Sequence, residues 1–271
     1  MAQSMDFDDL GNRMKRYEQA EAGRQLMPGL PVIARLDGHA FHTFTKGLKR
    51  PYDVRLSMAM IDTTIHLVDR YQADWGYTQS DEITLVFRPK DYEEFPMFSG
   101  KYQKMVSLMA STASVKFNRC VADSISEKSN ETPEFDCRIW NVPDLNEVAE
   151  CLRWRQMDAV KNSVSMAASS VFSDKELHGV NTKTRKAMLY SKGIVWDDYP
   201  EFFKQGTFVT RFTKMMTLDE ETRMKIPEKH RPPADAKFER RIVNTKSLPR
   251  LNSIVNPAGV LFHGEAPRFV M

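Results

Sequence analysis

The order of apolar and amphipathic segments between residues 25 and 142 limits the possible folds more than any other feature of this chain. LPVIARLD, residues 30–37, is a short apolar run with a proline near its start, which predicts a central strand. Residues 53–72 carry apolar side chains at helical spacing, and Asp53 is a candidate N-cap. GYTQ and ITLVF flank the polar residues 80–82 and predict a hairpin with acids at its tip.

Two further segments complete a known order of elements. Residues 99–123 predict a helix with Ser99 as its cap, and residues 134–143 alternate like a strand that stops at Pro143. The order strand, helix, strand, strand, helix, strand is the split βαβ, or ferredoxin-like, arrangement. We therefore predict an α+β protein in which residues 1–142 form a ferredoxin-like polymerase palm domain (βαββαβ).

The character of the sequence changes after Pro143, where we place a domain boundary. Residues 144–172 predict a long helix, and TKTRKAMLYSKG, residues 182–193, a shorter one. TFVTRFTKM and RRIVNTKSL predict strands, and the proline-rich IPEKHRPPADAKFE between them predicts a mobile loop. Residues 143–271 should thus form a helical, fingers-like part followed by a mixed C-terminal region.

Composition favours a globular protein of a reducing compartment. The 271 residues are 41% apolar, enough for a sizeable core, and the net charge of +3 does not by itself indicate nucleic-acid binding. Cys120, Cys137 and Cys151 lack the spacing of a zinc or redox site, which predicts free thiols.

No apolar run reaches the ~20 residues of a membrane span. The polar N-terminal stretch, where residues 6–23 predict a helix ended by Gly23, is unlike a signal peptide. We expect a cytoplasmic protein with no membrane contact.

Three acidic residues lie where the predicted central strands end. Asp37 ends the first strand, and Asp81 and Glu82 lie at the hairpin tip. These strands are neighbours in a ferredoxin-like sheet, so the acids can meet at one edge. Carboxylates on rigid strand ends suit Mg²⁺, and a paired-metal site aligns an attacking oxygen, a phosphorus and a leaving oxygen. Ordinary turns rich in acids are the alternative. We predict Asp37, Asp81 and Glu82 as catalytic residues.

The glycine-bracketed loop after Asp37 could hold phosphates beside this metal site. Gly38 lets the chain turn sharply, and its carbonyl could approach a metal. The amides from Gly38 to Phe41 could form an anion-binding nest. In the alternative arrangement, Phe41 and Phe44 pack inward while the histidines face solvent. The side chains that could meet a triphosphate are His39, His42 and Lys46, with Lys49 and Arg50 as further phosphate ligands or solvated charges.

Two basic groups in the second half favour a nucleic-acid substrate. One lies on the predicted helix RWRQMDAVKNS and the other on NTKTRKAMLYSKG. Phosphate contacts by Lys and Arg supply sequence-independent affinity for RNA or DNA. A solvated helix face is the alternative for any one of these residues. The predicted RNA-binding residues are Arg153, Arg155, Lys161, Asn162, Lys183, Arg185, Lys186 and Lys192.

Two other functions would use part of the same features. A nucleotide cyclase could share the palm architecture, although the long basic helices beyond the palm are more than a small-molecule cyclase needs. A non-catalytic RNA-binding module would not require Asp37 and Asp81. The sequence has no G-x-S-x-G motif and no Walker A loop, so hydrolase and P-loop schemes find no support.

Four segments together resemble the tRNA-His guanylyltransferase family, whose members add nucleotides in the 3′-to-5′ direction. They are RLDGHAFHTFTKGLKRPYD, GYTQSDEITLVF, LRWRQMDAVKNS and KAMLYSKGIVWDDYPEFFKQGTFV, in the family's order. The resemblance runs from about residue 12 to residue 212. It implies a palm-like catalytic domain with two Mg²⁺ ions, ATP and GTP as substrates, and a homotetramer.

The resemblance also implies roles for single residues. The family's metal ligands fall on Asp37, the Gly38 carbonyl and Asp81, and its adjacent acid falls on Glu82. The positions implied to bind the nucleotide are Gly38, His39, Ala40, Phe41, His42, Arg50, Asp53 and Ser80, beside Lys49 from the residue pattern.

One departure from the family pattern narrows the expected function. Eukaryotic members follow the RQ-x-D element with H-I-N-N-L-Y-N, where this chain reads VKNSVSM, with Val160 at the histidine position. The chain therefore resembles the guanylyltransferase-like branch, which favours template-dependent 5′-end repair over untemplated G addition. We predict a Mg²⁺-dependent 3′-to-5′ nucleotidyltransferase that acts on the 5′ end of tRNA or tRNA-like RNA.

Overall fold

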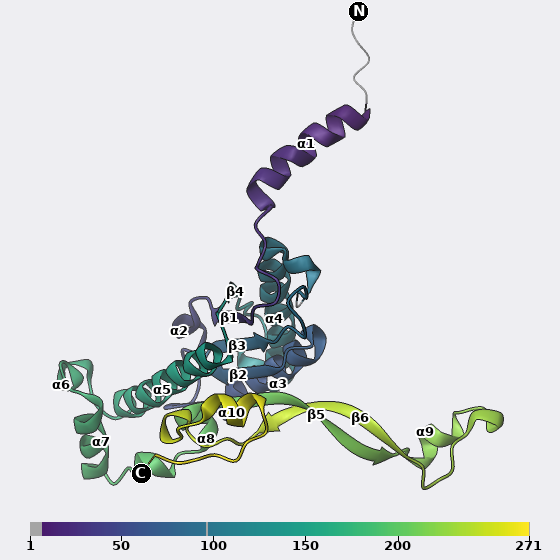
Figure 1. The fold of residues 1–271 in the computed structure, drawn as a ribbon. Coiled ribbons are helices and arrows are strands. Elements are labelled where there is room, and N and C mark those ends of the chain that lie inside the picture. Colours follow the sequence, from purple (N-terminus) through teal and green to yellow (C-terminus); the bar gives the residue numbers. More distant parts are fainter. Residues whose placement is uncertain (1–6, 96, 271) are drawn as a thin grey trace, which may run out of the picture.

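An antiparallel six-stranded sheet runs through the body of the molecule in the computed structural model, which describes residues 7–95 and 97–270 (Figure 1). The strands are β1 (Val32–Gly38), β2 (Trp75–Gln79), β3 (Glu82–Phe87), β4 (Phe135–Asn141), β5 (Thr207–Thr217) and β6 (Lys237–Lys246). Their order across the sheet is β4-β1-β3-β2-β5-β6. The first four strands have the ferredoxin-like order, which confirms the predicted α+β palm fold.

Helices cover both faces of this sheet. The helices α3 (Val54–Tyr71) and α4 (Tyr102–Ser124) pack on one face, and α5 (Leu145–Ser169) and α10 (Pro257–Phe262) pack on the other. The remaining helices are α1 (Phe7–Ala22), α2 (Phe41–Phe44), α6 (Asp174–Leu177), α7 (Thr182–Ser191), α8 (Glu201–Gln205) and α9 (Glu220–Met224). The helix α1 extends away from the body (Figure 1). Within residues 7–95 and 97–270, no helix combines the length and apolar character needed to cross a membrane.

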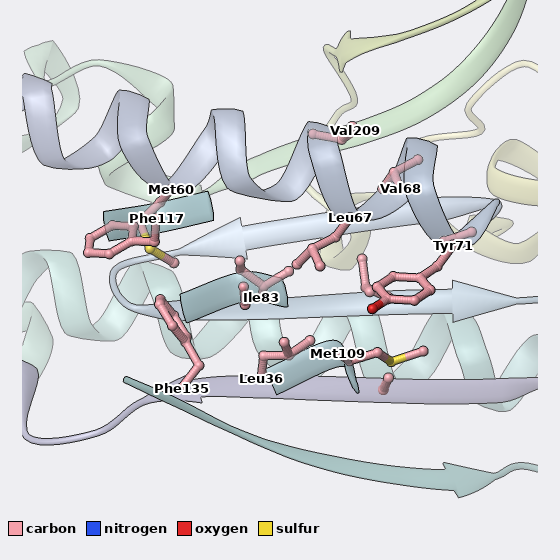
Figure 2. Close-up of a cluster of buried hydrophobic side chains, with 14 of the residues drawn as sticks. Leu36, Met60, Leu67, Val68, Tyr71, Ile83, Met109, Phe117, Phe135 and Val209 are labelled. Atoms are coloured by element: carbon pink, nitrogen blue, oxygen red, sulfur yellow. The ribbon is translucent and has the colours of Figure 1, made fainter. Parts of the chain in front are cut away.

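The central strand β1 contributes to two hydrophobic cores. Leu36 packs with Leu67 of α3 and Ile83 of β3 on the α3 and α4 side, as Figure 2 shows. Ile33 lies on the opposite face, in the cluster that includes Leu152 of α5. Because both faces are covered, β1 reads in the sequence as a continuous apolar run. Asp37 lies at the end of this rigid, buried strand.

The two halves of the chain share the sheet. The strand β5 pairs with β2, with Trp75 opposite Thr210, and β6 pairs with β5. The β5–β6 hairpin continues well beyond the body and carries α9 near its far end (Figure 1). A third core around Val164, Leu189 and Trp196 joins α5 to α7. The predicted boundary near residue 142 thus separates two stretches of sequence whose strands belong to one sheet.

Two local predictions are wrong. The N-cap of α4 is Lys101, whereas Ser99 lies in a preceding 3₁₀ turn with a φ of 50°. The predicted mobile loop before β6 is also shorter than expected, because the pairing of the hairpin continues to Thr217 opposite Lys237. Cross-strand pairing therefore extends β6 into a segment whose charge and proline content indicate a loop.

The tight packing of β2 against α3 yields a stability prediction. A Cβ atom on Gly76 would lie 2.6 Å from Cγ2 of Val68 and 2.7 Å from Cγ2 of Thr64. Both side chains are β-branched and stiff in a helix, so the G76A variant should unfold with a free energy roughly 1–3 kcal/mol lower than wild type. Urea unfolding measures this difference. Gly11→Ala is the matched control, because nothing lies within 4 Å of its added Cβ, and equal stability of G76A and wild type would contradict the packing described.

Candidate active site

The end of β1 and the tip of the β2–β3 hairpin meet through the backbone. The Gly38 amide donates a hydrogen bond to the Asp81 carbonyl at 3.1 Å. Ser80 enables the tight turn with a φ of 49°. Burial raises the pKa of Asp81, and the negative charge of Asp37 raises it further. The structure thus brings the two strand-end carboxylates together in a half-buried place where they repel each other.

This arrangement fits a hard cation. Asp37, Asp81 and the Gly38 carbonyl offer only oxygen atoms, the ligands that Mg²⁺ prefers. In the part of the chain that the structure describes, no group of three or more His, Cys, Asp or Glu side chains is placed to hold a metal. The protein therefore offers few ligands, and the rest of a Mg²⁺ coordination sphere would be water and substrate phosphate oxygens.

Glu82 is next to Asp37 in the sheet, but its carboxylate is already bound. Arg155 of α5 donates from Nε to Oε1 at 2.7 Å and from Nη2 to Oε2 at 2.6 Å. Only 8% of each side chain is exposed. Arg155 also contacts Asp158, at 3.0 Å. Glu82 is thus held by α5 instead of being free for a metal, and Arg155 is unavailable for the RNA contact predicted for it.

The loop after β1 combines buried and exposed residues. The His39 amide donates to the Glu134 carbonyl at 2.8 Å, so the amides of Gly38 and His39 are both occupied and cannot belong to the predicted nest. Phe41 is buried, while the side chains of His39 and His42 are exposed. Ala40, with a φ of 53°, begins the short helix α2. The rings that pack around Phe41 are Phe44, Phe117 and Phe135.

Asp53 has a structural role. Its carboxylate caps α3 by accepting from the Arg55 amide at 3.0 Å, and it accepts from the Lys49 amide at 3.3 Å. The Arg55 guanidinium binds both carboxylate oxygens, at 3.0 and 2.8 Å. These hydrogen bonds from Arg55 lower the pKa of Asp53 to about 2. The predicted nucleotide contact of this buried carboxylate is therefore replaced by a helix cap, while Lys49 and Arg50 remain exposed.

Several predicted RNA-binding residues are used inside the fold. Arg153 donates to the carbonyls of Leu251 and Ile254, and so ties the C-terminal segment to α5. Arg185 donates to the backbone carbonyls of Val180 and Leu177. These two arginines are already bonded to the backbone, and Asn162 donates to the carboxylate of Asp158.

Three of the predicted RNA-binding residues present an exposed cation. They are Lys161 on α5, Lys183 on α7 and Lys192 at the end of α7. Lys186 lies closer to the protein, with its Nζ 3.5 Å from the centre of the Trp196 ring and 3.9 Å from Asp197. The structure therefore keeps a basic surface on the second half, made of fewer residues than predicted.

Two charged residues of β4, one acidic and one basic, were not predicted as site residues. Asp136 is opposite Asp37, and Arg138 is opposite Arg35, in the β1–β4 register. The alternation in EFDCRIWN places Asp136 and Arg138 on one face of the strand, which was the available signal. The sequence does not show which strand pairs with β4, and only the register of that pairing shows that this face adjoins Asp37.

The Asp53 cap predicts a specific pH dependence of stability. The folded-state pKa of about 2 lies below the ordinary value of 3.8, so its stabilisation is present above pH 4 and is lost as the pH falls toward 2. Asp53→Asn should therefore lower the unfolding free energy by roughly 2 kcal/mol at pH 7 and by much less near pH 2. Urea unfolding at several pH values measures this, with the exposed Asp235→Asn as control. The same deficit at every pH would contradict the proposed role of the charge.

The buried ion pair between Arg155 and Glu82 predicts that substitutions at these two residues, which are far apart in sequence, have strongly coupled effects on stability. Arg155→Met or Glu82→Gln alone leaves a buried partner unpaired and should cost about 3–5 kcal/mol of stability. The double variant should lose less than the sum of the two. It should also retain the wild-type affinity for Mg²⁺, measured by calorimetry, because Glu82 is not free to act as a ligand. A folded double variant that no longer binds Mg²⁺ would show that Glu82 is a metal ligand.

Comparisons with known proteins agree with this geometry. The family model described as tRNAHis guanylyltransferase matches residues 11–143. A solved bacterial tRNA(His) guanylyltransferase-like protein in complex with ATP is 38% identical, with a TM-score of 0.70 over 74% of this chain and 88% of that one. A similar bacterial complex with GTP is 28% identical, with a TM-score of 0.67 over 90% and 94% of the two chains.

A curated relative extends the likeness to eukaryotes. The tRNA(His) guanylyltransferase of Saccharomyces cerevisiae is 26% identical over 219 residues, which cover 74% of this chain and 91% of the yeast protein. The family model's residues 11–143 include the strands that carry Asp37 and Asp81, and a likeness over 90% of this chain continues into its second half. With the strand-end carboxylates on this fold and these matches along both halves, the chain belongs to the tRNA(His) guanylyltransferase family of nucleotidyltransferases.

Proposed function

We propose that this chain is a Mg²⁺-dependent 3′-to-5′ nucleotidyltransferase that extends the 5′ end of tRNA or tRNA-like RNA. The observation that carries the proposal is the meeting of Asp37 and Asp81 at the ends of adjoining strand segments. These carboxylates and the Gly38 carbonyl would hold two Mg²⁺ ions. The ions supply Lewis-acid stabilisation of charge on phosphoryl oxygens when bound.

The loop beside these carboxylates is proposed to bind the nucleotide. His39, His42, Lys49 and Arg50 are exposed and lie in the chain directly after the metal-binding strand end. Ser80 is exposed at the facing hairpin turn. The ATP and GTP complexes of the similar bacterial proteins support both triphosphates as substrates.

The reaction we propose has two nucleotidyl-transfer steps. A 5′-monophosphate oxygen of the RNA attacks the α-phosphorus of ATP or GTP, and pyrophosphate leaves. The 3′-hydroxyl of an incoming nucleoside triphosphate then attacks the activated 5′-phosphorus, and the nucleoside monophosphate leaves. The buried Asp81 and the fixed strand end that carries Asp37 would hold the ions without movement of the backbone.

Template-dependent 5′-end repair is the proposed form of this activity. The eukaryotic histidine position is held by Val160, which packs against the apolar cluster of Val164, Leu189 and Trp196. Residue 160 thus packs inside the protein where eukaryotic members carry a histidine, and the proposal of repair follows from this departure from the eukaryotic motif. In this proposal, residues 1–142 carry the chemistry and the exposed lysines of residues 143–271 contact RNA.

We further propose a cytoplasmic homo-oligomer, with the family's tetramer as the expected form. The support is exposed apolar surface on parts that extend from the body: Met14 and Tyr17 on α1, and Phe212 and Met215 on β5 (Figure 1). Isolated arms of this kind gain stability when another surface covers their apolar side chains.

A direct assay tests the proposed function. The protein is incubated with a 5′-truncated, monophosphorylated tRNA, Mg²⁺, ATP and labelled nucleoside triphosphates, and 5′ extension is followed on a gel. Asp37→Asn and Asp81→Asn should each lower the rate at least ~10³-fold, because each removes a metal ligand. Asp235→Asn is the exposed acidic control. Cyclic or linear dinucleotide products in place of extended RNA would overturn the proposal in favour of a cyclase.

A further inference from the structure

The segment between Leu48 and Asp53 carries two cations that have no partner in the protein. Leu48 is buried in the core beneath α3 and α4, and Asp53 caps α3, so both ends of the segment are fixed. The side chains of Lys49 and Arg50 are exposed, and among residues 7–95 and 97–270 neither makes an ion pair or a side-chain hydrogen bond. The backbone of the segment therefore sets where these two cations lie.

Tyr52 attaches this segment to the second half of the chain. The centre of its ring lies 4.7 Å from that of Phe203, with an angle of 31° between the ring planes. The rings of Phe202 and Tyr199 meet it nearly at right angles, at 5.4 and 6.0 Å. Aromatic rings attract each other at such separations. Tyr199, Phe202 and Phe203 thus form an aromatic cluster that holds Tyr52, which is two residues from Arg50 in the chain.

The helix α8, which carries two rings of the aromatic cluster, is itself fixed in place. The Gln205 carbonyl accepts a hydrogen bond from the Tyr77 hydroxyl at 2.9 Å. The Lys204 carbonyl accepts one from the Ser163 hydroxyl at 3.2 Å. Tyr77 belongs to β2 and Ser163 to α5, so α8 is bonded both to the sheet and to the long helix over it. Tyr52 therefore packs against a rigid part of the protein.

We infer that Tyr52 is a positioning residue for the nucleotide, because its contact with the aromatic cluster holds Arg50 where the guanidinium meets the triphosphate. The inference rests on the proposed function, and it adds a residue that acts without touching the nucleotide. A loop that is already fixed in its bound form loses less conformational freedom when the ligand binds. A guanidinium also donates its hydrogen bonds in a fixed planar fork, so its position decides how well it binds phosphate.

ATP binding by the full-length protein tests this role. Calorimetry measures the Kd for ATP with Ca²⁺ in place of Mg²⁺. Arg50→Gln should weaken binding about 10-fold, because it removes a charge-assisted hydrogen bond to phosphate. Tyr52→Leu should weaken binding about 5-fold, because a mobile Arg50 loses most of that contribution. Tyr52→Phe keeps the ring and should bind ATP within about twofold of wild type.

The Arg50→Gln background separates positioning from packing. If Tyr52 acts through Arg50, the double variant Tyr52→Leu and Arg50→Gln should bind ATP within about twofold of Arg50→Gln alone. A role in packing alone would add the full loss from Tyr52→Leu in that background, and this result would overturn the inference. Wild-type affinity in folded Tyr52→Leu, or in Arg50→Gln, would overturn it as well.

Two further variants test for general effects. Tyr92→Leu removes an aromatic ring that is 80% exposed and lies outside the aromatic cluster, so its Kd for ATP should equal that of wild type. If Tyr52→Leu fails to fold, Phe203→Leu removes the nearest ring of the cluster and should weaken ATP binding by a similar factor of about 5. Unchanged affinity in folded Phe203→Leu would then overturn the inference.

The extension assay adds a kinetic readout. In Tyr52→Leu the KM for ATP should rise about 5-fold while kcat stays within about threefold of wild type, because the strand-end carboxylates are untouched. A lower kcat with an unchanged KM would contradict a role in positioning the nucleotide.

The proposed function and the role of Tyr52 fail in different ways. A wild-type protein that extends RNA, with a Tyr52→Leu variant that binds ATP as wild type does, would overturn the positioning role alone. A wild-type protein that shows the dependence of Tyr52 on Arg50 in ATP binding but does not extend RNA would overturn the proposed reaction alone.

Discussion

The hydrogen bond from the Gly38 amide to the Asp81 carbonyl fixes the part of the molecule on which the proposed chemistry depends. It joins the end of β1 to the β2–β3 turn, and both elements are anchored in the buried sheet. Two carboxylates that repel each other are thereby kept close, and burial raises the pKa of Asp81. A bound cation would offset that repulsion, so the folding of the palm favours the proposed metal site.

The second half of the chain is coupled to this site through one buried ion pair. Arg155 of α5 holds both carboxylate oxygens of Glu82, which lies beside Asp37 in the sheet. The pair removes one negative charge from the group of acids and fixes α5 over the sheet. It also places the Arg155 guanidinium 4.4 Å from the centre of the Trp154 ring, so this part of α5 is held in a fixed position over the strand-end carboxylates. Breaking such a pair costs far more than it would on the surface, since each partner would be left buried and unpaired.

Much of the fold could be predicted from the sequence because its signals are local. The apolar run of β1, the N-cap Asp53 and the acids at strand ends each lie within a few residues, and these elements formed as expected. The partners of the charged side chains could not be predicted, because Glu82 and Arg155 are 73 residues apart. The same holds for Arg153, whose carbonyl acceptors come from the C-terminal segment. A charge pattern shows that a residue is polar, while only the tertiary structure shows whether another part of the chain already binds it.

Anomalous scattering from crystals soaked with Mn²⁺ and a nucleoside triphosphate tests the central claim most directly. Mn²⁺ replaces Mg²⁺ on oxygen ligands and can be located by its own signal. We predict two peaks at the Asp37 and Asp81 carboxylates, with Glu82 still bound to Arg155. Peaks coordinated by Glu82, or no peak at Asp37 and Asp81, would contradict the account.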